Sequence, residues 1–306
     1  IDSDSDPEDV LFDSLQMLYE FQPITLTSAG ASYTYIHHTS HPSLQPNLHP
    51  TPVKITLQTP DPEAANWSLH ASSVWIASTQ LALGIEFLQL DGHIERMRRT
   101  RPECQSGDRK LKVLELGAAA GLPSILIAKL HGASNRISVL ATDYPDPKLI
   151  QTLSQNIERN GVEEHCYAAP YAWGSDPAPL FALGAPGKVE SISGGFDMII
   201  AADTLWNPDL HSIFIETIQQ ALRRDSEARV HLVAGLHTGR YTVSSFLCSV
   251  AGAGFRVVGV LEREVVSIDD AGKTDVTQTK IREWDVTRAE YEEEKDRRRW
   301  VIWIEL

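Results

Sequence analysis

The sequence predicts an α/β fold in which a doubly wound, mostly parallel sheet ends in an antiparallel strand. Three observations support this prediction. Short apolar stretches alternate with helical stretches from Leu111 onward, a pattern typical of strand–helix–strand units. The first of these strands runs through a turn that contains Gly117 and Gly121 into a helix. The last two strands have no long apolar helix between them, so they must pair antiparallel if they are neighbours.

The individual elements follow from the apolar pattern and from the residues at their ends. We expect strands over residues 111–116, 137–141, 196–202, 230–236, 255–261 and 300–305, and a further short strand just before Tyr171. We expect helices over residues 122–130, 148–160, 209–223 and 243–250. Three of them begin with a proline, whose missing N–H would have had no partner within the helix: Pro123, Pro147 and Pro208. Two of them are predicted to have side-chain N-caps, Asp146 and Asn207.

Residues 1–66 differ from the rest of the chain, and we interpret them as an N-terminal extension to a main domain over residues 67–306. They are rich in Asp, Ser, Pro and His, and only residues 32–36 and 53–57 resemble strands. Nothing in this region resembles a long helix. We therefore expect a partly extended segment that carries two short strands.

Two polar segments flank the expected sheet. Apolar residues recur on one helical stripe over residues 73–90, and a solvated polar connection is expected over residues 91–110. Residues 290–299, before the last strand, mix acidic and basic side chains. Glutamates there lie four residues before arginines, as Glu294 does before Arg298, which predicts ion pairs on a solvated helical turn.

Composition places the chain among ordinary globular proteins of a reducing compartment. Of its 306 residues 42% are hydrophobic, but no apolar run approaches the roughly 20 residues of a membrane helix. Three cysteines, Cys104, Cys166 and Cys248, are too few and too scattered for a disulfide framework. The first residues are acidic and lack the apolar core of a secretion signal, and the start at Ile1 rather than Met suggests that the native beginning lies upstream. We expect a cytoplasmic protein.

The net charge of −14 disfavours binding to nucleic acid and is compatible with a basic partner. A cluster of histidines, His37, His38, His41 and His49, could suggest a metal site. It lies among Pro and Ser with no acid nearby, so we interpret it as a solvated loop. We predict a chain that binds no metal, no nucleic acid and no membrane, and that acts as a monomer.

The turn after the first strand of the main domain, within residues 113–124, is the strongest candidate for a ligand site. Gly117 and Gly121 let a ligand approach the backbone, and the following helix offers unpaired N–H groups. The dinucleotide fingerprint G-x-G-x-x-G is absent. Glu115 instead precedes the first glycine by two residues, and its carboxylate suits the cationic sulfonium and ammonium of S-adenosylmethionine. The alternatives are a dinucleotide enzyme and a tight turn without a ligand.

Two further residues follow strands beside this turn. Asp143 ends the second strand, where an acid can accept hydrogen bonds from both hydroxyls of a ribose. Trp173, within residues 171–174, follows the short third strand. It is a candidate adenine wall, although its position is equally compatible with a place in the core.

The strand over residues 196–202 ends at Asp203, which should therefore point into the crevice where ligands bind. Methyl transfer to an amine requires that the amine first lose its proton. A carboxylate with an aromatic neighbour, Trp206, can orient the amine and help to remove the proton. The aromatic face also tolerates the cationic product. The alternative for Trp206 is simple packing, and we interpret Asn207 as a helix cap.

Together these residues resemble methyltransferase family 16, the lysine-methyltransferase-like group. Its closest branch looks like the fungal proteins called nicotinamide N-methyltransferase-like, or elongation factor 1-alpha N-terminal and lysine methyltransferases. The resemblance covers most of residues 67–223 and, more loosely, the chain to Leu261. The matching stretches are residues 74–75, 113–124, 141–147, 171–174 and 196–207. The resemblance implies the Rossmann-like, seven-stranded class I methyltransferase sheet with an antiparallel last strand, and S-adenosyl-L-methionine as cofactor with S-adenosyl-L-homocysteine as product.

The resemblance also implies roles for particular residues. Asp203 and Trp206 would form the family's acceptor motif, an Asp followed three residues later by an aromatic residue. Trp206 departs from the usual Tyr or Phe, and Ala119 replaces a middle glycine with an added methyl that should be tolerated. The residues implied to line the cofactor pocket are Trp75, Glu115, Gly117, Ala119, Gly121, Asp143, Tyr144, Trp173 and Ala202.

We therefore predict an enzyme, an S-adenosylmethionine-dependent N-methyltransferase of protein amines. The acceptor would be a lysine or an N-terminal α-amine, and elongation factor 1-alpha is the best single candidate substrate. A small-molecule N-methyltransferase acting on a nicotinamide-like acceptor is the first alternative. A non-catalytic cofactor-binding scaffold is the second.

Overall fold

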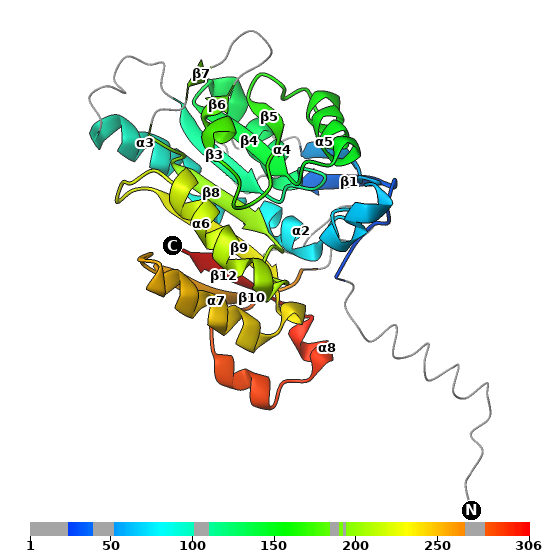
Figure 1. Ribbon diagram of the computed structural model, residues 1–306, viewed down its shortest axis with the longest axis vertical. Helices are drawn as coiled ribbons and strands as arrows, with labels where there is room; N and C mark the ends of the chain where they lie inside the picture. Colours follow the sequence, from blue (N-terminus) through cyan, green and yellow to red (C-terminus); the bar gives the residue numbers. More distant parts are fainter. Residues whose placement is uncertain (1–23, 39–51, 101–109, 184–189, 192–193, 267–278) are drawn as a thin grey trace, which may run out of the picture.

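The computed structural model describes residues 24–38, 52–100, 110–183, 190–191, 194–266 and 279–306. Its centre is an eight-stranded sheet with the strand order β11-β10-β12-β9-β8-β3-β4-β5, which Figure 1 shows from β5 near the top to β10 near the bottom. The strands are β3 (Leu111–Leu116), β4 (Ile137–Asp143), β5 (Cys166–Pro170), β8 (Met198–Ala202), β9 (Arg229–Gly235), β10 (Gly259–Glu264), β11 (Ile281–Glu283) and β12 (Trp300–Glu305).

The strand directions confirm the predicted class of sheet. β5, β4, β3, β8 and β9 are parallel to one another. The last strand, β12, pairs antiparallel with both β9 and β10. Seven strands therefore form the predicted doubly wound sheet, and β11 adds an antiparallel edge strand on β10 that the sequence did not suggest.

The core lies on both faces of this sheet. Successive strand residues point to opposite faces, so Val113 belongs to one buried apolar cluster and Leu114 to the other. Every residue of β4 is buried, including the polar side chains of Ser138, Thr142 and Asp143, as expected for a central parallel strand that is covered on both faces. One cluster includes residues of α2 (Ile76–Leu83), α3 (Leu90–Thr100), α4 (Leu122–His131) and α5 (Pro147–Arg159). The other includes residues of α6 (His211–Ala221) and α7 (Arg240–Gly252).

The two predicted side-chain N-caps are confirmed. Asp146 caps α5 by accepting hydrogen bonds from the backbone N–H groups of Lys148 and Leu149, at 2.9 and 3.0 Å. Asn207 caps the short 3-10 turn η6 (Pro208–Leu210) that leads into α6. None of the helices in the described part of the chain is both long and apolar enough to cross a membrane.

Three expectations about element boundaries are wrong. The helix expected over residues 73–90 is interrupted at Gly84, where an added Cβ would lie 2.2 Å from the Arg263 side chain, and a 3-10 turn, η2 (Ile85–Leu88), follows. Residues 91–100, expected as a polar connection, belong to helix α3, which buries Ile94 and Met97 beneath its charged face. The strand expected over residues 255–261 is β10, which begins only at Gly259 and ends at Glu264. Residues 101–109, with Cys104, lie outside the described residues.

The two N-terminal strands form as predicted and pair as an antiparallel hairpin, β1 (Ser32–His37) with β2 (Val53–Gln58). Asn156 of α5 holds the hairpin, because its side chain accepts from the Gln58 N–H and donates to the Gln58 carbonyl, both at 2.8 Å. Tyr35 is fully buried in the same apolar cluster as α4. The hairpin thus shares the main core, and a boundary between residues 66 and 67 stays a prediction.

The interpretation of the histidine cluster as a solvated loop is wrong for His37. This side chain is buried in β1 beside the Tyr35 ring, whose centroid lies 6.3 Å away. His38 is exposed, and His41 and His49 lie outside the described residues. Within the ranges that the structure describes, no group of His, Cys, Asp and Glu side chains could hold a metal ion.

A buried ion-pair network fastens the segment before β12 to the sheet. Arg240, at the start of α7, contacts both carboxylate oxygens of Glu262 at 2.6 and 2.9 Å and one oxygen of Glu292 at 2.7 Å. Arg282 of β11 bridges the same two glutamates, and Arg288 adds a contact of 2.9 Å to Glu262. Burial alone would raise the pKa of Glu262, but Arg240 and Arg282 hold that pKa below its usual value.

The predicted short helix is also present, as α8 (Glu294–Arg297), and the predicted pair between Glu294 and Arg298 forms.

Arg240→Met should lower the free energy of unfolding by about 3 kcal/mol, because it leaves buried carboxylates without their principal cation. Urea unfolding measures this loss. Arg298→Met is the matched control, since it removes only a partly exposed pair and should cost less than about 0.5 kcal/mol. Equal losses in the two variants would contradict the proposed importance of the buried network.

Candidate active site at the carboxyl ends of the strands

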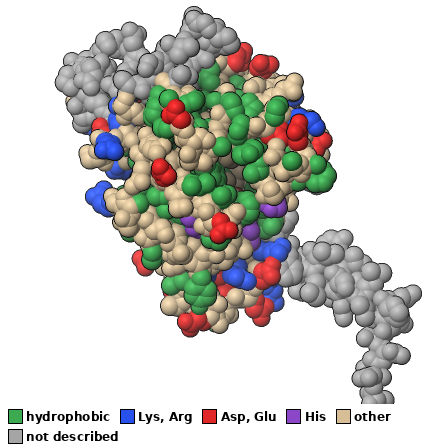
Figure 2. Space-filling model, viewed as in Figure 1, with side chains coloured by type: hydrophobic (Ala, Val, Ile, Leu, Met, Phe, Trp, Pro, Cys, Tyr) green, Lys and Arg blue, Asp and Glu red, His purple; other side chains and the backbone are tan. Residues whose placement is uncertain are grey.

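A pocket of about 220 Å³ opens where β3, β4, β5 and β8 end, beneath residues 69–75. Figure 2 shows apolar side chains around a hollow near the middle of this face, with histidines below it. A cavity of about 30 Å³ adjoins the pocket under the glycine turn. The predicted residues in the larger pocket are Trp75, Gly117, Ala119, Asp143, Tyr144, Trp173, Ala202, Asp203 and Trp206. The remaining two, Glu115 and Gly121, line the smaller cavity.

The glycine turn is held open by left-handed backbone. Gly117 and Gly121 have φ of +75° and +86°, and an added Cβ at Gly121 would lie 2.6 Å from the Leu153 side chain. Ala119 also has a positive φ, +46°. A β-carbon in this conformation costs about 1 kcal/mol, so the change from glycine to alanine adds backbone strain as well as a methyl. The Ala119 N–H donates to Asp143 Oδ2 at 2.7 Å, which helps to hold this conformation.

Glu115 lies beneath the turn and is 1% exposed. Its carboxylate accepts hydrogen bonds from the backbone N–H of Ser124, at 3.1 Å, and from the Ser124 hydroxyl. Ser124 lies in the first turn of α4, so Glu115 satisfies an N–H that has no partner within the helix. Burial raises the pKa of Glu115 to about 8. The geometry therefore gives Glu115 a capping role in addition to its place beside the small cavity.

Asp143 ends β4 and lines the pocket. Oδ2 accepts from Ala119 N–H and Oδ1 from Tyr144 N–H, each at 2.7 Å. Burial raises the pKa of Asp143 to about 6. Each carboxylate oxygen can accept more than one hydrogen bond, so both keep capacity for a ligand hydroxyl. Tyr144, which lines the same pocket, is 42% exposed.

Trp173 lies both against the core and beside the pocket, and its role as an adenine wall stays a prediction. One part of the ring packs in the core against Phe214, with ring centroids 4.6 Å apart. The ring also lines the pocket, across from the glycine turn, where its Cζ2 would lie 3.6 Å from a Cβ added at Gly117. The Gly174 N–H donates to the Thr217 hydroxyl at 3.0 Å and fixes the segment on α6.

Asp203 stands at the end of β8 with a φ of +55°, which is strained for a residue other than glycine. Its Oδ1 accepts from the Gly235 N–H at 3.0 Å and lies 3.8 Å from Nε2 of His237. Its Oδ2 is buried and has no hydrogen-bond partner among the described residues. Burial raises the pKa of Asp203, and the neighbouring His237 acts in the opposite direction.

Several aromatic rings near this carboxylate contact one another. The His70 ring makes edge contacts with two tryptophan rings. The distance between ring centroids is 5.0 Å to Trp206 and 6.1 Å to Trp75. Trp75 stacks on His237 at 5.8 Å, and its Nε1 donates to the His70 carbonyl at 2.7 Å. The sequence did not point to His70 or His237. His237 follows the carboxyl end of β9, and that position was a signal that could have found it; His70 gave none.

Comparison with known proteins decides the family. The sequence profile of the lysine methyltransferase family matches residues 63–250, more than half of the chain. The chain belongs to this family.

Individual relatives agree with the assignment. The chain is 33% identical over 180 residues to "Protein N-terminal and lysine N-methyltransferase EFM7" of Gibberella zeae, a match that covers 55% of this chain and 66% of that protein. It is 31% identical over 176 residues to the Schizosaccharomyces pombe protein of the same name, with coverages of 56% and 66%. The chain thus spans slightly less than two thirds of these relatives.

Solved structures show weaker likeness. TrmN from Thermus thermophilus shares 13% identity with a TM-score of 0.39, over 69% of this chain and 47% of that one. CrArsM, an arsenic(III) S-adenosylmethionine methyltransferase from Chlamydomonas reinhardtii, shares 13% identity with a TM-score of 0.38, over 70% and 73%. Likeness at this level is too low to support a conclusion.

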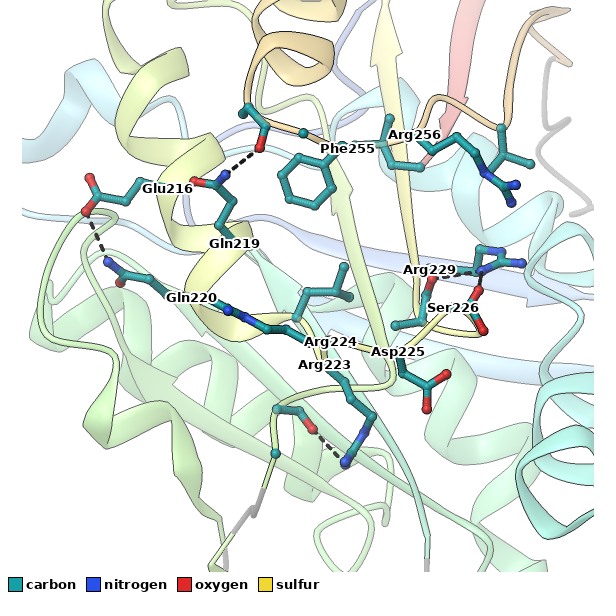
Figure 3. A pocket seen from close by; sticks show the side chains of 18 of the residues that line it. Glu216, Gln219, Gln220, Arg223, Arg224, Asp225, Ser226, Arg229, Phe255 and Arg256 are labelled. Carbon is teal, nitrogen blue, oxygen red and sulfur yellow. Dashed lines mark hydrogen bonds between the residues drawn. The ribbon is translucent and has the colours of Figure 1, made fainter. Parts of the chain in front are cut away.

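This family member has a second, more open hollow of about 1370 Å³, at the amino ends of the parallel strands (Figure 3). Arginines line it, but Arg223 donates to Asp197 at 2.7 Å and Arg229 lies 3.3 Å from Glu305. None of the predicted site residues lies there. The smaller pocket at the carboxyl ends is therefore the better candidate.

Glu115→Gln should alter how stability depends on pH. The pKa of Glu115 is about 8 in the folded chain against an ordinary value of 4.5, so the folded state binds more protons between these values and stability falls as pH rises. Glutamine does not titrate and its amide oxygen can still accept from Ser124. The melting temperature of the variant, relative to wild type and without cofactor, should rise from pH 5 to pH 8.

Differential scanning calorimetry checks this, and the exposed Glu163→Gln is the control. Asp143 also titrates, but it is present in both chains, so most of its contribution cancels in the difference. A melting difference that stays constant with pH would refute the assignment.

Proposed function

We propose that this chain is an S-adenosylmethionine-dependent N-methyltransferase of protein amines. The observation that carries the proposal is that Oδ2 of Asp203 is buried without a hydrogen-bond partner among the described residues, while Asp203 lines the same pocket as Asp143 and the glycine turn. Leaving a buried acceptor without a partner costs about 1–3 kcal/mol. An amine at this position would supply the missing hydrogen bond.

The residues of the cofactor side fit S-adenosyl-L-methionine. When bound, this cofactor supplies a methyl group activated by a sulfonium. Asp143 would accept the ribose hydroxyls, and the ring of Trp173 would lie against the adenine. Gly117 has no side chain, so the cofactor could approach its backbone closely. A Cβ at this position would lie 3.1 Å from the Thr204 side chain and would narrow the space. Trp75, Glu115, Ala119, Gly121, Tyr144 and Ala202 would complete the walls.

Asp203 and Trp206 would act on the acceptor. A carboxylate buried beside the methyl donor can accept an N–H of the amine and direct the nitrogen lone pair. The face of Trp206 would favour the cation that methylation produces. The substitution of Trp for the usual Tyr or Phe keeps the aromatic face.

The names of the relatives support a protein acceptor, at a lysine or an N-terminal α-amine. The net charge of −14 favours a basic substrate. Elongation factor 1-alpha is our specific candidate. Scattered cysteines favour a reducing compartment such as the cytoplasm.

Asp143→Ala should weaken binding of S-adenosyl-L-homocysteine at least about tenfold, which corresponds to about 1.4 kcal/mol, because two charge-assisted hydrogen bonds to the ribose are lost. Titration calorimetry measures the affinity, and thermal unfolding verifies that the variant is folded. Glu163→Ala, which removes an exposed carboxylate, should bind like wild type. Wild-type affinity in a folded Asp143→Ala would exclude the ribose role.

Asp203→Asn should lose about 100-fold or more in methyl transfer, since an amide cannot take the amine proton. Its affinity for S-adenosyl-L-homocysteine should stay within about threefold of wild type. The assay mixes purified chain, isotope-labelled S-adenosyl-L-methionine and a cell lysate, and follows label on protein. Asp209→Asn, a nearby exposed position, is the control. Label found only on metabolites would show that the acceptor is a small molecule and not a protein. Binding of the cofactor without any methyl transfer would favour a non-catalytic scaffold.

A further inference from the structure

We propose that His237 is a positioning residue for the acceptor amine and acts through Asp203. This inference rests on the proposed methyl transfer and extends it to a side chain with no role in the function as proposed above. His237 belongs to the 3-10 turn η7 (Leu236–Thr238), directly after β9.

The backbone first fixes where the Asp203 carboxylate points. The Asp203 N–H donates to the Val233 carbonyl at 2.8 Å, although the residue has left the extended conformation for a φ of +55°. This turn directs the side chain toward β9, where Oδ1 accepts the Gly235 N–H at 3.0 Å. The strain of a left-handed aspartate persists only where its surroundings enforce it.

His237 closes the same side of the carboxylate. Its Nε2 lies 3.8 Å from Oδ1, and its ring stacks on Trp75 with an interplanar angle of 21°. The His237 side chain is 15% exposed and that of Asp203 is 3% exposed, so the pair is largely shielded from water.

Gly235 makes this arrangement possible. Besides donating its N–H to Asp203, it leaves room for the imidazole, because an added Cβ would lie 2.2 Å from Nδ1 of His237. The φ of Gly235 is −68°, which any residue adopts. The absence of a side chain at position 235, rather than an unusual backbone conformation, is therefore what accommodates His237.

The two oxygens of Asp203 consequently have different roles. Oδ1 faces Gly235 and His237, while Oδ2 is left to the acceptor. His237 restricts rotation of the carboxylate and favours its ionised form, so that Oδ2 is oriented to accept the N–H of the amine. Loss of the imidazole nitrogen should slow methyl transfer more than it weakens cofactor binding.

The test separates the polar contact from the ring packing. His237→Phe keeps a ring against Trp75 but has no nitrogen, whereas His237→Gln keeps an N–H donor at a similar reach from the backbone. We expect His237→Phe to lower kcat about tenfold or more while the affinity for S-adenosyl-L-homocysteine stays within about twofold. His237→Gln should restore kcat to within about threefold of wild type. His165→Phe, at the amino end of β5, should have no effect.

Gly235→Ala provides a second probe that does not depend on the folding of a ring variant. Its added methyl should displace His237 and lower kcat, but it should have no further effect in a His237→Ala background. Three results would each overturn the inference. The first is a wild-type kcat in His237→Phe, and the second is an equally low kcat in His237→Phe and His237→Gln. The third is additive effects of Gly235→Ala and His237→Ala on kcat. A wild-type chain that methylates no acceptor would instead refute the proposed function, and this inference with it.

Discussion

The hydrogen bond between the Ala119 N–H and Asp143 Oδ2 is the contact on which the half of the site proposed for the cofactor depends. It joins the turn after β3 to the end of β4, and the N–H groups of Gly117 and Ala118 reinforce it by donating to the Thr142 carbonyl at 2.9 Å each. The turn is thereby held in a left-handed conformation that leaves its backbone accessible. Without this connection, the carboxylate and the glycine turn would have no fixed relation to each other.

The position of the site follows from the strand order. β3 has β4 on one side and β8 on the other, so the chain changes direction across the sheet at β3. The loops after β3 and β8 therefore diverge and leave a crevice at their carboxyl ends. β3 and β4 build the side of the pocket that we propose for the cofactor, and β8 and β9 build the side that we propose for the acceptor. This division places Asp143 and Asp203 on opposite sides of one pocket.

Local signals made much of this predictable from the sequence. Apolar runs and capping residues act over a few positions, so the strands, Asp146 as a cap and the residues after each strand could be located. Contacts between distant segments could not. His70 approaches Trp206 from the segment before α2, and Arg240 meets Glu262 across the sheet edge. Helix α3 was missed because charged residues outnumber Ile94 and Met97 in its sequence, although those two face the core.

Three buried carboxylates show how the site differs from the rest of the core. Burial raises the pKa of Glu115, Asp143 and Asp203, so their charged forms are disfavoured in the folded chain. The Glu262 side chain is also buried from solvent, yet its arginine partners lower its pKa. The difference is that Glu262 has cations within hydrogen-bonding distance, whereas the three site carboxylates have mainly N–H and hydroxyl donors. A cationic ligand in the pocket would add positive charge beside these carboxylates and favour their ionised forms.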